Sequence, residues 1–362
     1  MTSPRIAVVG AGLGGLTLAR VLQVHGLPVT VFEREPSPDS RPQGGTLDMH
    51  VGSGQTALAK AGLLDEFRAL ARPEGQEKRI HDEHGTLLHH EQPADGDESM
   101  PEIDRGQLRG LLIGSLADGA IRWGHGVEGA AGRSVLFPDG SSEEFDLVVG
   151  ADGAWSRVRP GLSEVTPVYT GVSFVETGFE EARHPELARM VGNGTMSAYG
   201  PDKAVLAQRN SNGRIRVYAA YRGPQDRPVS EVLSMFDGWA ESVRALLLEA
   251  DEPFESRPLF TLPVGHSWPH TPGRTLLGDA AHLMPPLGVG ANLAMLDGAE
   301  LADALAAGLT TGPDVDAAVR AYESVMFPRA ARLARFATDG LDALFSPEGV
   351  KGALRLFGEL TG

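Results

Sequence analysis

A glycine-rich turn near the N-terminus places the strongest constraint on the fold of this chain. The turn, Gly10-Ala11-Gly12-Leu13-Gly14-Gly15, has the spacing G-x-G-x-x-G. It follows an apolar run at 6–9, typical of a buried parallel strand, and opens a segment at 13–25 with apolar residues at helical spacing. A second apolar run follows at 29–32. The order strand, turn, helix, strand predicts a doubly wound α/β domain.

The glycines of this turn stand where a dinucleotide pyrophosphate needs them. Gly10 allows the tight turn, Gly12 lets the backbone approach the phosphates, and Gly15 allows close packing of the helix on the strand. The helix points free N–H groups and its positive dipole end at the same place. The second strand ends at Glu33, 18 residues after Gly15, where a carboxylate can accept hydrogen bonds from an adenosine ribose. Arg34 beside it either accompanies a 2′-phosphate or is a solvated surface charge.

Two later segments repeat the order of strand, turn and acidic residue. An apolar run at 146–149 leads into a turn that presents Asp152 beside a glycine, although Asp-Gly is also the commonest pair in plain β-turns. A run at 274–277 leads into Gly278-Asp279-Ala280-Ala281-His282. Asp279 can bind a hydroxylated chain there, whereas His282 is interpreted as a packing or hydrogen-bonding residue.

A last glycine turn, Gly288-Val289-Gly290-Ala291-Asn292, opens an apolar helix whose N-terminus favours negative charge. Further helices are predicted over 53–70, 105–116, 229–248 and 315–344, and a hairpin turn is predicted at 82–85.

Composition excludes several classes of function. The chain has 362 residues, a formal net charge of −16 and no cysteine. The acidic balance argues against a nucleic-acid or anionic-membrane surface, and the missing cysteines exclude thiolate metal sites, cysteine nucleophiles and dithiol relays. The histidines at 81, 84, 89 and 90 surround a predicted hairpin turn in a polar stretch, so we interpret them as surface residues and expect no metal site. We expect a cytoplasmic protein without a membrane span.

The three glycine-containing constellations, in this order and at these separations, resemble those of the group A flavin monooxygenases, the para-hydroxybenzoate hydroxylase-like family. Within that family the chain most resembles the tetracycline-inactivating flavin monooxygenases. Residues 44–55 are similar to the segment beside the flavin ring, residues 101–109 to the segment that follows it, and residues 278–286 match almost letter for letter. The likeness extends to about Phe327 and is weaker over 167–260, where the substrate would bind.

The resemblance implies FAD bound noncovalently, reduced by NADPH or NADH, and reacting with O₂ to a flavin C4a-hydroperoxide that delivers one oxygen atom. The flavin performs this chemistry, so we expect no catalytic side chain. The resemblance places Arg41 at the nicotinamide cofactor and Asp152 at a turn that serves both cofactors. The helix N-terminus after Gly290 should stabilise the negative charge of the reduced flavin. The residues expected to bind FAD are Gly10, Gly12, Gly15, Glu33, Arg34, Asp48, Arg105, Asp152, Asp279, Gly290, Ala291 and Asn292.

The resemblance also implies the fold and its division. We expect an α/β protein with a Rossmann-like FAD-binding domain, an inserted antiparallel β-sheet substrate domain and a C-terminal helix. The expected parts are 1–166 and 261–327 for the FAD-binding domain, 167–260 for the substrate-binding sheet, and 328–362 for the C-terminal helical segment.

The chain departs from the tetracycline enzymes around the flavin ring and the substrate. The loop after Pro286 is one residue shorter and carries Val289 in place of Gln. Glu176 stands in place of Gln, Gly194 in place of Arg, and Arg216 in place of a His that holds the tetracycline. These changes remove the reason to expect tetracycline itself. They leave a bulky phenolic, polycyclic or polyketide-like molecule, with Glu176 and Arg216 as candidate substrate-binding residues.

The sequence therefore favours a monomeric, NAD(P)H-consuming FAD monooxygenase and leaves one alternative open. A flavin-dependent halogenase is disfavoured because it needs a Trp-x-Trp pair, and all four tryptophans are isolated. A disulfide reductase would need two cysteines. The open alternative is a non-catalytic FAD-containing or antibiotic-sequestering binding protein, which the shortened loop at 288–290 favours.

Overall fold

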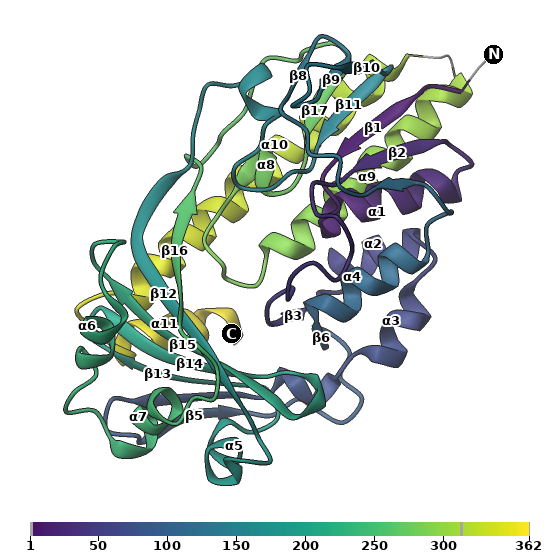
Figure 1. Cartoon of the computed structure of the whole chain (residues 1–362). Coiled ribbons are helices and arrows are strands. Elements are labelled where there is room, and N and C mark those ends of the chain that lie inside the picture. Colours follow the sequence, from purple (N-terminus) through teal and green to yellow (C-terminus); the bar gives the residue numbers. More distant parts are fainter. Residues whose placement is uncertain (1–2, 312–313, 362) are drawn as a thin grey trace.

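The computed structural model describes residues 3–311 and 314–361. Its N-terminal part is built on a five-stranded parallel sheet in the order β17-β11-β1-β2-β7. These strands are β1 (Ile6–Val9), β2 (Val29–Phe32), β7 (Ile121–Arg122), β11 (Leu147–Gly150) and β17 (Arg274–Leu276). Every residue of β1 and β11 is buried, as expected of strands covered on both faces. Helices α1 (Leu13–Val24) and α9 (Gly290–Thr311) pack against each other beside the sheet (Figure 1).

Parallel pairing brings the predicted turns to one edge of this sheet. Ala7 of β1 lies opposite Val148 of β11, and Val149 lies opposite Thr275 of β17. Because the strands run in the same direction, the segments that follow β1, β11 and β17 all leave the sheet at its carboxyl edge. In doubly wound folds that edge is where ligands bind.

A seven-stranded sheet forms the second part of the molecule, in the order β16-β12-β15-β14-β13-β4-β5. Its strands are β4 (Lys78–Asp82), β5 (Leu87–Glu91), β12 (Val168–Glu180), β13 (Thr195–Gly200), β14 (Lys203–Arg209), β15 (Arg214–Arg222) and β16 (Glu255–Thr261). All neighbours are antiparallel except β4 and β13, which are parallel. The outer face packs on α5 (Pro185–Val191), α6 (Val229–Ser234) and α7 (Glu241–Leu248) through a separate hydrophobic core.

The α/β fold with an antiparallel sheet is confirmed, whereas the expected division of the chain remains a prediction that one segment does not follow. The hairpin of β4 and β5 lies in the stretch 1–166, yet it extends the seven-stranded sheet through its pairing with β13. A pairing between segments more than a hundred residues apart leaves no local pattern in the sequence.

Two helices predicted as continuous are interrupted. The helix expected over 229–248 is divided into α6 and α7, with Gly238 at φ +87° between them. The helix expected over 53–70 is divided into α2 (Gly54–Lys60) and α3 (Leu64–Leu70), with Gly62 at φ +67°. Both glycines adopt the left-handed conformation: Gly62 directly follows the C-cap residue of α2, and Gly238 lies in the turn between α6 and α7.

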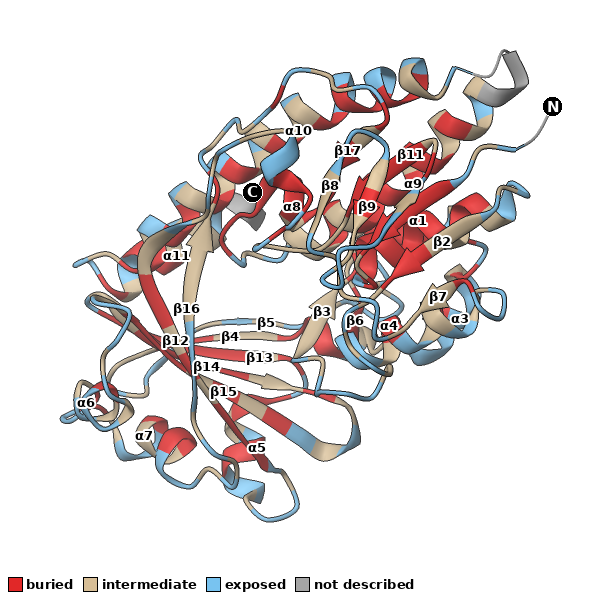
Figure 2. Cartoon of the chain, turned by 45° about the horizontal axis from the view of Figure 1, so that its top comes forward, coloured by how far each residue is buried: buried red, intermediate tan, exposed pale blue. Residues whose placement is uncertain are grey.

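The two parts are joined by short strands and by the C-terminal helices. The remaining elements are β3 (Thr46–Asp48), β6 (Glu102–Asp104), α4 (Arg105–Gly114), β8 (Gly129–Ala131), β9 (Ser134–Leu136), β10 (Ser142–Glu144), α8 (Asp279–His282), α10 (Val315–Leu344) and α11 (Val350–Thr361), besides three short 3₁₀ turns. Helix α10 continues through Pro328. Residues of this helix up to Ala337 belong to the core of the parallel-sheet part, whereas Leu341 and Leu344 form a separate cluster with residues of the large sheet that include Tyr199 and Ala220. Figure 2 shows the buried residues of both parts.

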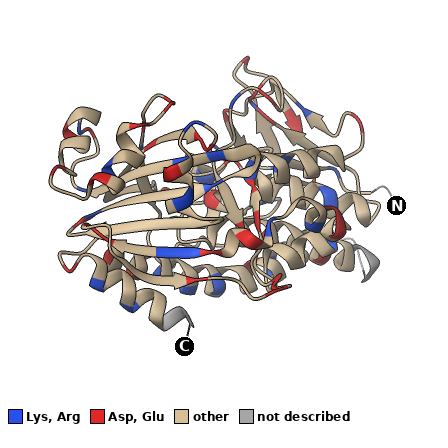
Figure 3. Cartoon of the chain, turned by 90° about the horizontal axis from the view of Figure 1, so that it is seen from below, with Lys and Arg blue, Asp and Glu red and all other residues tan. Residues whose placement is uncertain are grey.

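The surface carries charges of both signs. On the face seen from below, the described lysines and arginines are interspersed with acidic side chains (Figure 3). Within the part of the chain that the structure describes, none of the helices combines the length and apolarity needed to span a bilayer.

Candidate active site at the carboxyl edge of the parallel sheet

The first glycine turn is in contact with the other two. A Cβ atom on Gly10, which has φ +105°, would lie 2.5 Å from the carbonyl oxygen of Ala151, in the turn that presents Asp152. A Cβ atom on Gly14 would lie 2.8 Å from the side chain of Leu277, just before Asp279. The three turns therefore meet at one place.

The acidic residues of the first two turns are held in different ways. The Glu33 carboxylate accepts hydrogen bonds from the backbone N–H of Ala11 (2.8 Å) and of Glu35 (2.9 Å), so it lies beside the glycine turn. Asp152 Oδ2 accepts from the N–H of Arg157 (2.6 Å), whereas Asp152 Oδ1 is buried without a partner. Burial raises the pKa of Asp152 despite the hydrogen bonds that it accepts. A buried oxygen without a partner at this place suits a ligand that donates a hydrogen bond.

Two buried arginines that the sequence analysis did not single out hold these turns together. Arg109 of α4 donates to the carbonyls of Ala11 (3.1 Å) and Pro38 (2.9 Å), which ties the glycine turn to the loop after β2. Arg159 donates to the carbonyls of Ala154 (2.7 Å) and Ala280 (3.0 Å), which ties the second turn to α8. Arg109 follows Leu108, which lies on the apolar face of its helix, and this position is the one sequence feature that could have indicated a buried arginine.

Asn292 organises the segment predicted to lie beside the flavin ring. Its amide oxygen accepts from the backbone N–H of His50 (2.9 Å) and Gly54 (3.1 Å), and its amide nitrogen donates to the carbonyls of Asp48 (2.7 Å) and Gly288 (3.0 Å). The side chain is 2% exposed. Asn292 therefore fastens three chain segments at the N-terminus of α9.

The shortened loop at 288–290 is closely packed against the same segment. Gly288 has φ +79°, and a Cβ atom there would lie 2.8 Å from Asp48 Oδ2. His50 Nε2 lies 3.1 Å from the same carboxylate oxygen. Around Gly290 the space is open, with nothing within 4 Å of an added Cβ atom, and Gly12 has its nearest such neighbour at 4.0 Å. Gly12 and Gly290, at the starts of α1 and α9, thus leave room for a ligand.

Arg105 brings positive charge to this place. It is the first residue of α4, and its backbone N–H donates to the carbonyl of Gly45 (3.0 Å). Burial lowers the pKa of Arg105, and Asp279 acts in the opposite direction, so the two side chains lie near each other. Arg41 also acts on Arg105; it is exposed and pairs with Glu35. A cation at a helix N-terminus opposes the helix dipole, so this arrangement favours an anionic ligand.

The inner face of the seven-stranded sheet lies across from the ring-side segment. A Cβ atom on Gly45 would lie 3.0 Å from the Tyr218 hydroxyl and 3.5 Å from the Arg216 side chain. Arg216 forms an ion pair with Glu176, whose other carboxylate oxygen is 3.2 Å from Arg257. Phe174 packs on Tyr218 with ring centroids 5.7 Å apart. The two candidate substrate residues therefore face the cofactor region as a pair, beside an aromatic wall.

The remaining predicted residues are exposed or play a structural role. Arg34 is exposed on the loop after β2. His282 is buried and bonded to Asp297, as expected of a hydrogen-bonding residue. His81 is 6% exposed on β4, so the surface interpretation was wrong for this histidine. Within residues 3–311 and 314–361, groups of three histidine or carboxylate side chains that could hold a metal are absent.

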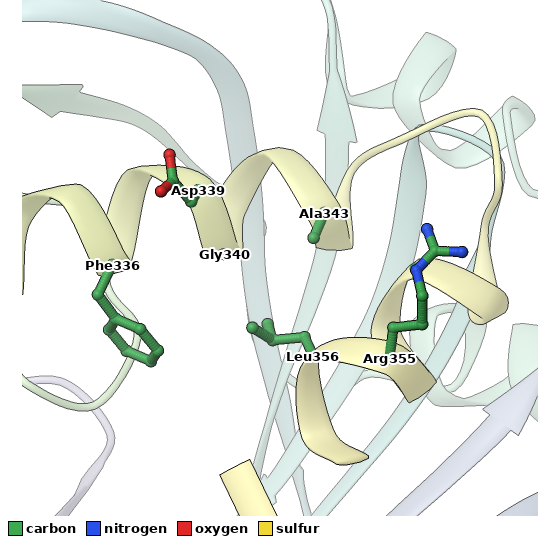
Figure 4. A pocket seen from close by; sticks show the side chains of 7 residues that line it. Phe336, Asp339, Gly340, Ala343, Arg355 and Leu356 are labelled. Carbon is green, nitrogen blue, oxygen red and sulfur yellow. The ribbon is translucent and has the colours of Figure 1, made fainter. Parts of the chain in front are cut away.

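A cavity of about 390 Å³ lies between α10 and α11 (Figure 4). It is lined by Phe336, Asp339, Gly340, Ala343, Gly352, Arg355 and Leu356.

Comparison with known proteins identifies the family. A family model described as an FAD binding domain matches residues 4–117 and 139–337. Monooxygenase asqM of Emericella nidulans is 34% identical, with 83% of each chain covered, and monooxygenase penA of Penicillium thymicola is 31% identical, with 96% of each covered. The chain belongs to the group A flavin-dependent monooxygenases. The flavin monooxygenase is thus an enzyme that depends on FAD, as the resemblance implied.

Further relatives agree with this assignment of the flavin monooxygenase. The 3-amino-4-hydroxybenzoate 2-monooxygenase PtmB3 of Streptomyces platensis is 31% identical over 97% of this chain and 91% of that protein. HpxO of Klebsiella pneumoniae, solved with FAD and uric acid, has a TM-score of 0.82 at 23% identity, with 99% of this chain and 92% of that chain covered. The tetracycline destructase Tet(55) has a TM-score of 0.75 at 23% identity, with 95% and 91% covered. At such identities the structures show a shared fold.

Proposed function

We propose that this enzyme uses NADPH or NADH and O₂ to insert one oxygen atom into a bulky phenolic, polycyclic or polyketide-like small molecule. The observation that carries the proposal is the position of Gly45, which joins the ring-side segment to Tyr218 and Arg216 on the inner face of the large sheet. An aromatic wall with an ion pair beside the flavin region suits an aromatic molecule with polar substituents. Support also comes from the relative PtmB3, whose name states that it hydroxylates an aminohydroxybenzoate.

The residues at the carboxyl edge fit FAD. The open space at Gly12 and the N-terminus of α1 suit the pyrophosphate, and Glu33 would accept from the adenosine ribose. The unpartnered Asp152 Oδ1 would accept from a hydroxyl group of the cofactor. Gly10, Gly15 and Arg34 would shape this end, and Asp48, Arg105, Asp279, Gly290, Ala291 and Asn292 would hold the rest.

When bound and reduced by NAD(P)H, FAD supplies the chemistry that activates O₂ for oxygen transfer. The protein supplies binding and electrostatics. The N-terminus of α9 at Gly290 and Ala291 presents backbone N–H groups that favour negative charge on the ring. Arg41, exposed on the loop after β2, would attract the phosphates of the nicotinamide cofactor. Glu176 and Arg216 would orient the polar groups of the substrate, and Phe174 and Tyr218 would exclude water.

The proposed activity is tested with the purified protein. We expect a yellow preparation with about one FAD per chain, which oxidises NADPH or NADH faster when a suitable phenolic or polyketide compound is added. Mass spectrometry of the product should show one added oxygen atom. If bound FAD is reduced by neither nicotinamide cofactor under any condition, the proposal fails and a binding protein is the better interpretation.

A further inference from the structure

A buried carboxylate that none of the residues above explains lies directly behind the third turn. Asp297 of α9 is 0% exposed, and its two oxygens are shared among three donors. Oδ2 accepts from the His282 ring nitrogen Nε2 (2.5 Å) and from the Gly278 N–H (3.2 Å), and Oδ1 accepts from Arg329 (3.0 Å). Burying a charge at this depth is unfavourable unless it is fully paired.

The partners of Asp297 stand at both ends of α8. Gly278 directly precedes this helix and has φ +58°, and His282 is its last residue. A helix of four residues has too few internal hydrogen bonds to be stable by itself, so its position depends on outside contacts. Asp279, the residue expected at FAD, begins this helix. Whatever fixes α8 therefore fixes the Asp279 carboxylate.

The charges around His282 favour its protonated form. Although burial lowers the pKa of His282, the contact with Asp297 and the field of Asp279 raise it above the ordinary value overall. The charged groups that act on the His282 ring are Asp297 and Asp279, and His266 lies near enough for His282 to act on it. Arg329 of α10 donates to the other oxygen of Asp297, and Arg159 donates to the Ala280 carbonyl within α8. Loss of one proton from His282 would leave a neutral ring that still donates from Nε2 to Asp297, but the positive charge beside this carboxylate would be gone.

We propose that Asp297 is a positioning residue for FAD binding: it fixes Asp279 by accepting hydrogen bonds from the Gly278 amide before α8 and from the His282 ring at its end. The inference deepens the proposed function, since it rests on Asp279 as an FAD contact. This inference gives the buried ion pairs of Asp297 with His282 and Arg329 a role in FAD affinity besides their role in the stability of the fold.

The test measures the Kd for FAD of apoprotein variants by the quenching of flavin fluorescence. We expect Asp297→Asn to raise the Kd about tenfold or more, because hydrogen bonds to a buried charge are lost. The matched control is Glu323→Gln, a carboxylate that is 3% exposed in the same core and bonds to Trp268 and Thr275. It should lower the melting temperature and leave the Kd within twofold of the wild type.

A pH profile separates positioning from a general loss of stability. In the wild type the Kd should rise as the pH rises through the raised pKa of His282, because the ring loses the positive charge that pairs with Asp297 and keeps only a neutral hydrogen bond. His282→Gln, which keeps an N–H donor but does not titrate, should fold and lack this rise. If Asp297→Asn does not fold, the pH dependence of the Kd for FAD in His282→Gln alone tests the positioning role.

Asp279→Ala serves as the reference variant. If it weakens FAD binding while both Asp297→Asn and His282→Gln bind as the wild type does, the positioning role is wrong and the proposed site stands. If Asp279→Ala itself has no effect on the Kd, Asp279 is not an FAD contact and the inference is overturned as well. An equal effect of Glu323→Gln and Asp297→Asn would also overturn it.

Discussion

Gly10 stands where two of the site's turns touch, and its backbone admits no side chain. It combines φ +105° with a neighbour that a Cβ atom would approach to 2.5 Å. That neighbour is the Ala151 carbonyl oxygen, a backbone atom that cannot turn aside. The sequence motif predicted the tight turn, but only the structure shows that the same glycine also makes room for the Asp152 turn.

We expect Gly10→Ala to destabilise the protein by about 1–3 kcal/mol and to weaken FAD binding, because the two turns must move apart. Urea unfolding and FAD titration measure the two effects. Gly110→Ala is the matched control, since that glycine lies inside α4 with nothing within 4 Å of an added Cβ atom. It should raise the stability by up to about 1 kcal/mol. Equal effects of the two substitutions would contradict the packing argument.

Arg105 tests the charge of the site. Arg105→Ala should raise the Kd for FAD about tenfold or more, because a cation that faces the anionic cofactor is removed. Arg332→Ala, which removes an exposed arginine on α10, should change the Kd by less than twofold. FAD binding that is unaffected by Arg105→Ala would show that the cofactor does not contact α4.

The residues that the sequence could not reveal each have at least one partner far along the chain. The motif indicated Glu33, Asp152 and Asp279, because acids that follow parallel strands gather at one edge. Arg109 and Arg159 were missed because an isolated arginine is usually a surface residue, and only tertiary structure shows which carbonyls it meets. Asp297 left a weak signal, as a carboxylate within an otherwise apolar helical run.

At the scale of elements, the glycines and other turn residues between apolar runs predicted the strand–turn–helix–strand unit, the 82–85 hairpin turn and the start of α9. They did not predict where helices break, because a glycine is tolerated inside a helix until packing requires a turn. The helices predicted over 53–70 and 229–248 include Gly62 and Gly238, yet both glycines adopt positive φ and lie in turns. The pairing of β4 with β13 was likewise invisible, since it depends on the arrangement of the whole sheet.

The ribbon of β3 and β6 contains a carboxylic acid with an unusual titration. Burial raises the pKa of Glu102 from 4.5 to about 7, and its side chain accepts a hydrogen bond from Thr46 Oγ1 (2.5 Å). Asp48 lies opposite it in the register and disfavours a second negative charge. The ribbon therefore favours the protonated acid.

The contribution of Glu102 to stability is fully present below pH 4.5 and is lost as the pH rises through about 7. Glu102→Gln mimics the protonated acid. Its free energy of unfolding relative to the wild type should therefore increase by roughly 1–3 kcal/mol between pH 5 and pH 8. Urea unfolding of both proteins at several pH values gives this difference. A difference that is constant over the range would mean that Glu102 does not titrate there.

At the scale of the whole molecule, Arg222 makes two polar contacts between the large sheet and the C-terminal end of α10. It extends from β15 and donates to the Phe345 carbonyl (2.8 Å) and to Asp342 (2.7 Å) at the C-terminal end of α10. A cation at that end of a helix satisfies free carbonyls and favours the dipole.

Arg222→Ala should lower the free energy of unfolding by about 1–2 kcal/mol and raise the KM for the aromatic substrate more than the Kd for FAD, because the sheet loosens from α10. Arg244→Ala is the control, since it removes only an exposed pair with Asp237 and should cost less than about 1 kcal/mol. If both variants lose the same stability, Arg222 is no more than another surface charge.

Helix α10, 30 residues and about 45 Å long, runs from the core of the parallel-sheet part to the hydrophobic cluster that contains Leu341, Leu344 and residues of the large sheet (Figure 1). A continuous helix of this length opposes a hinge motion of the large sheet relative to the parallel sheet, because such a motion would have to break hydrogen bonds within the helix. We therefore expect the two sheets to keep their relative positions when a ligand binds at the carboxyl edge of the parallel sheet.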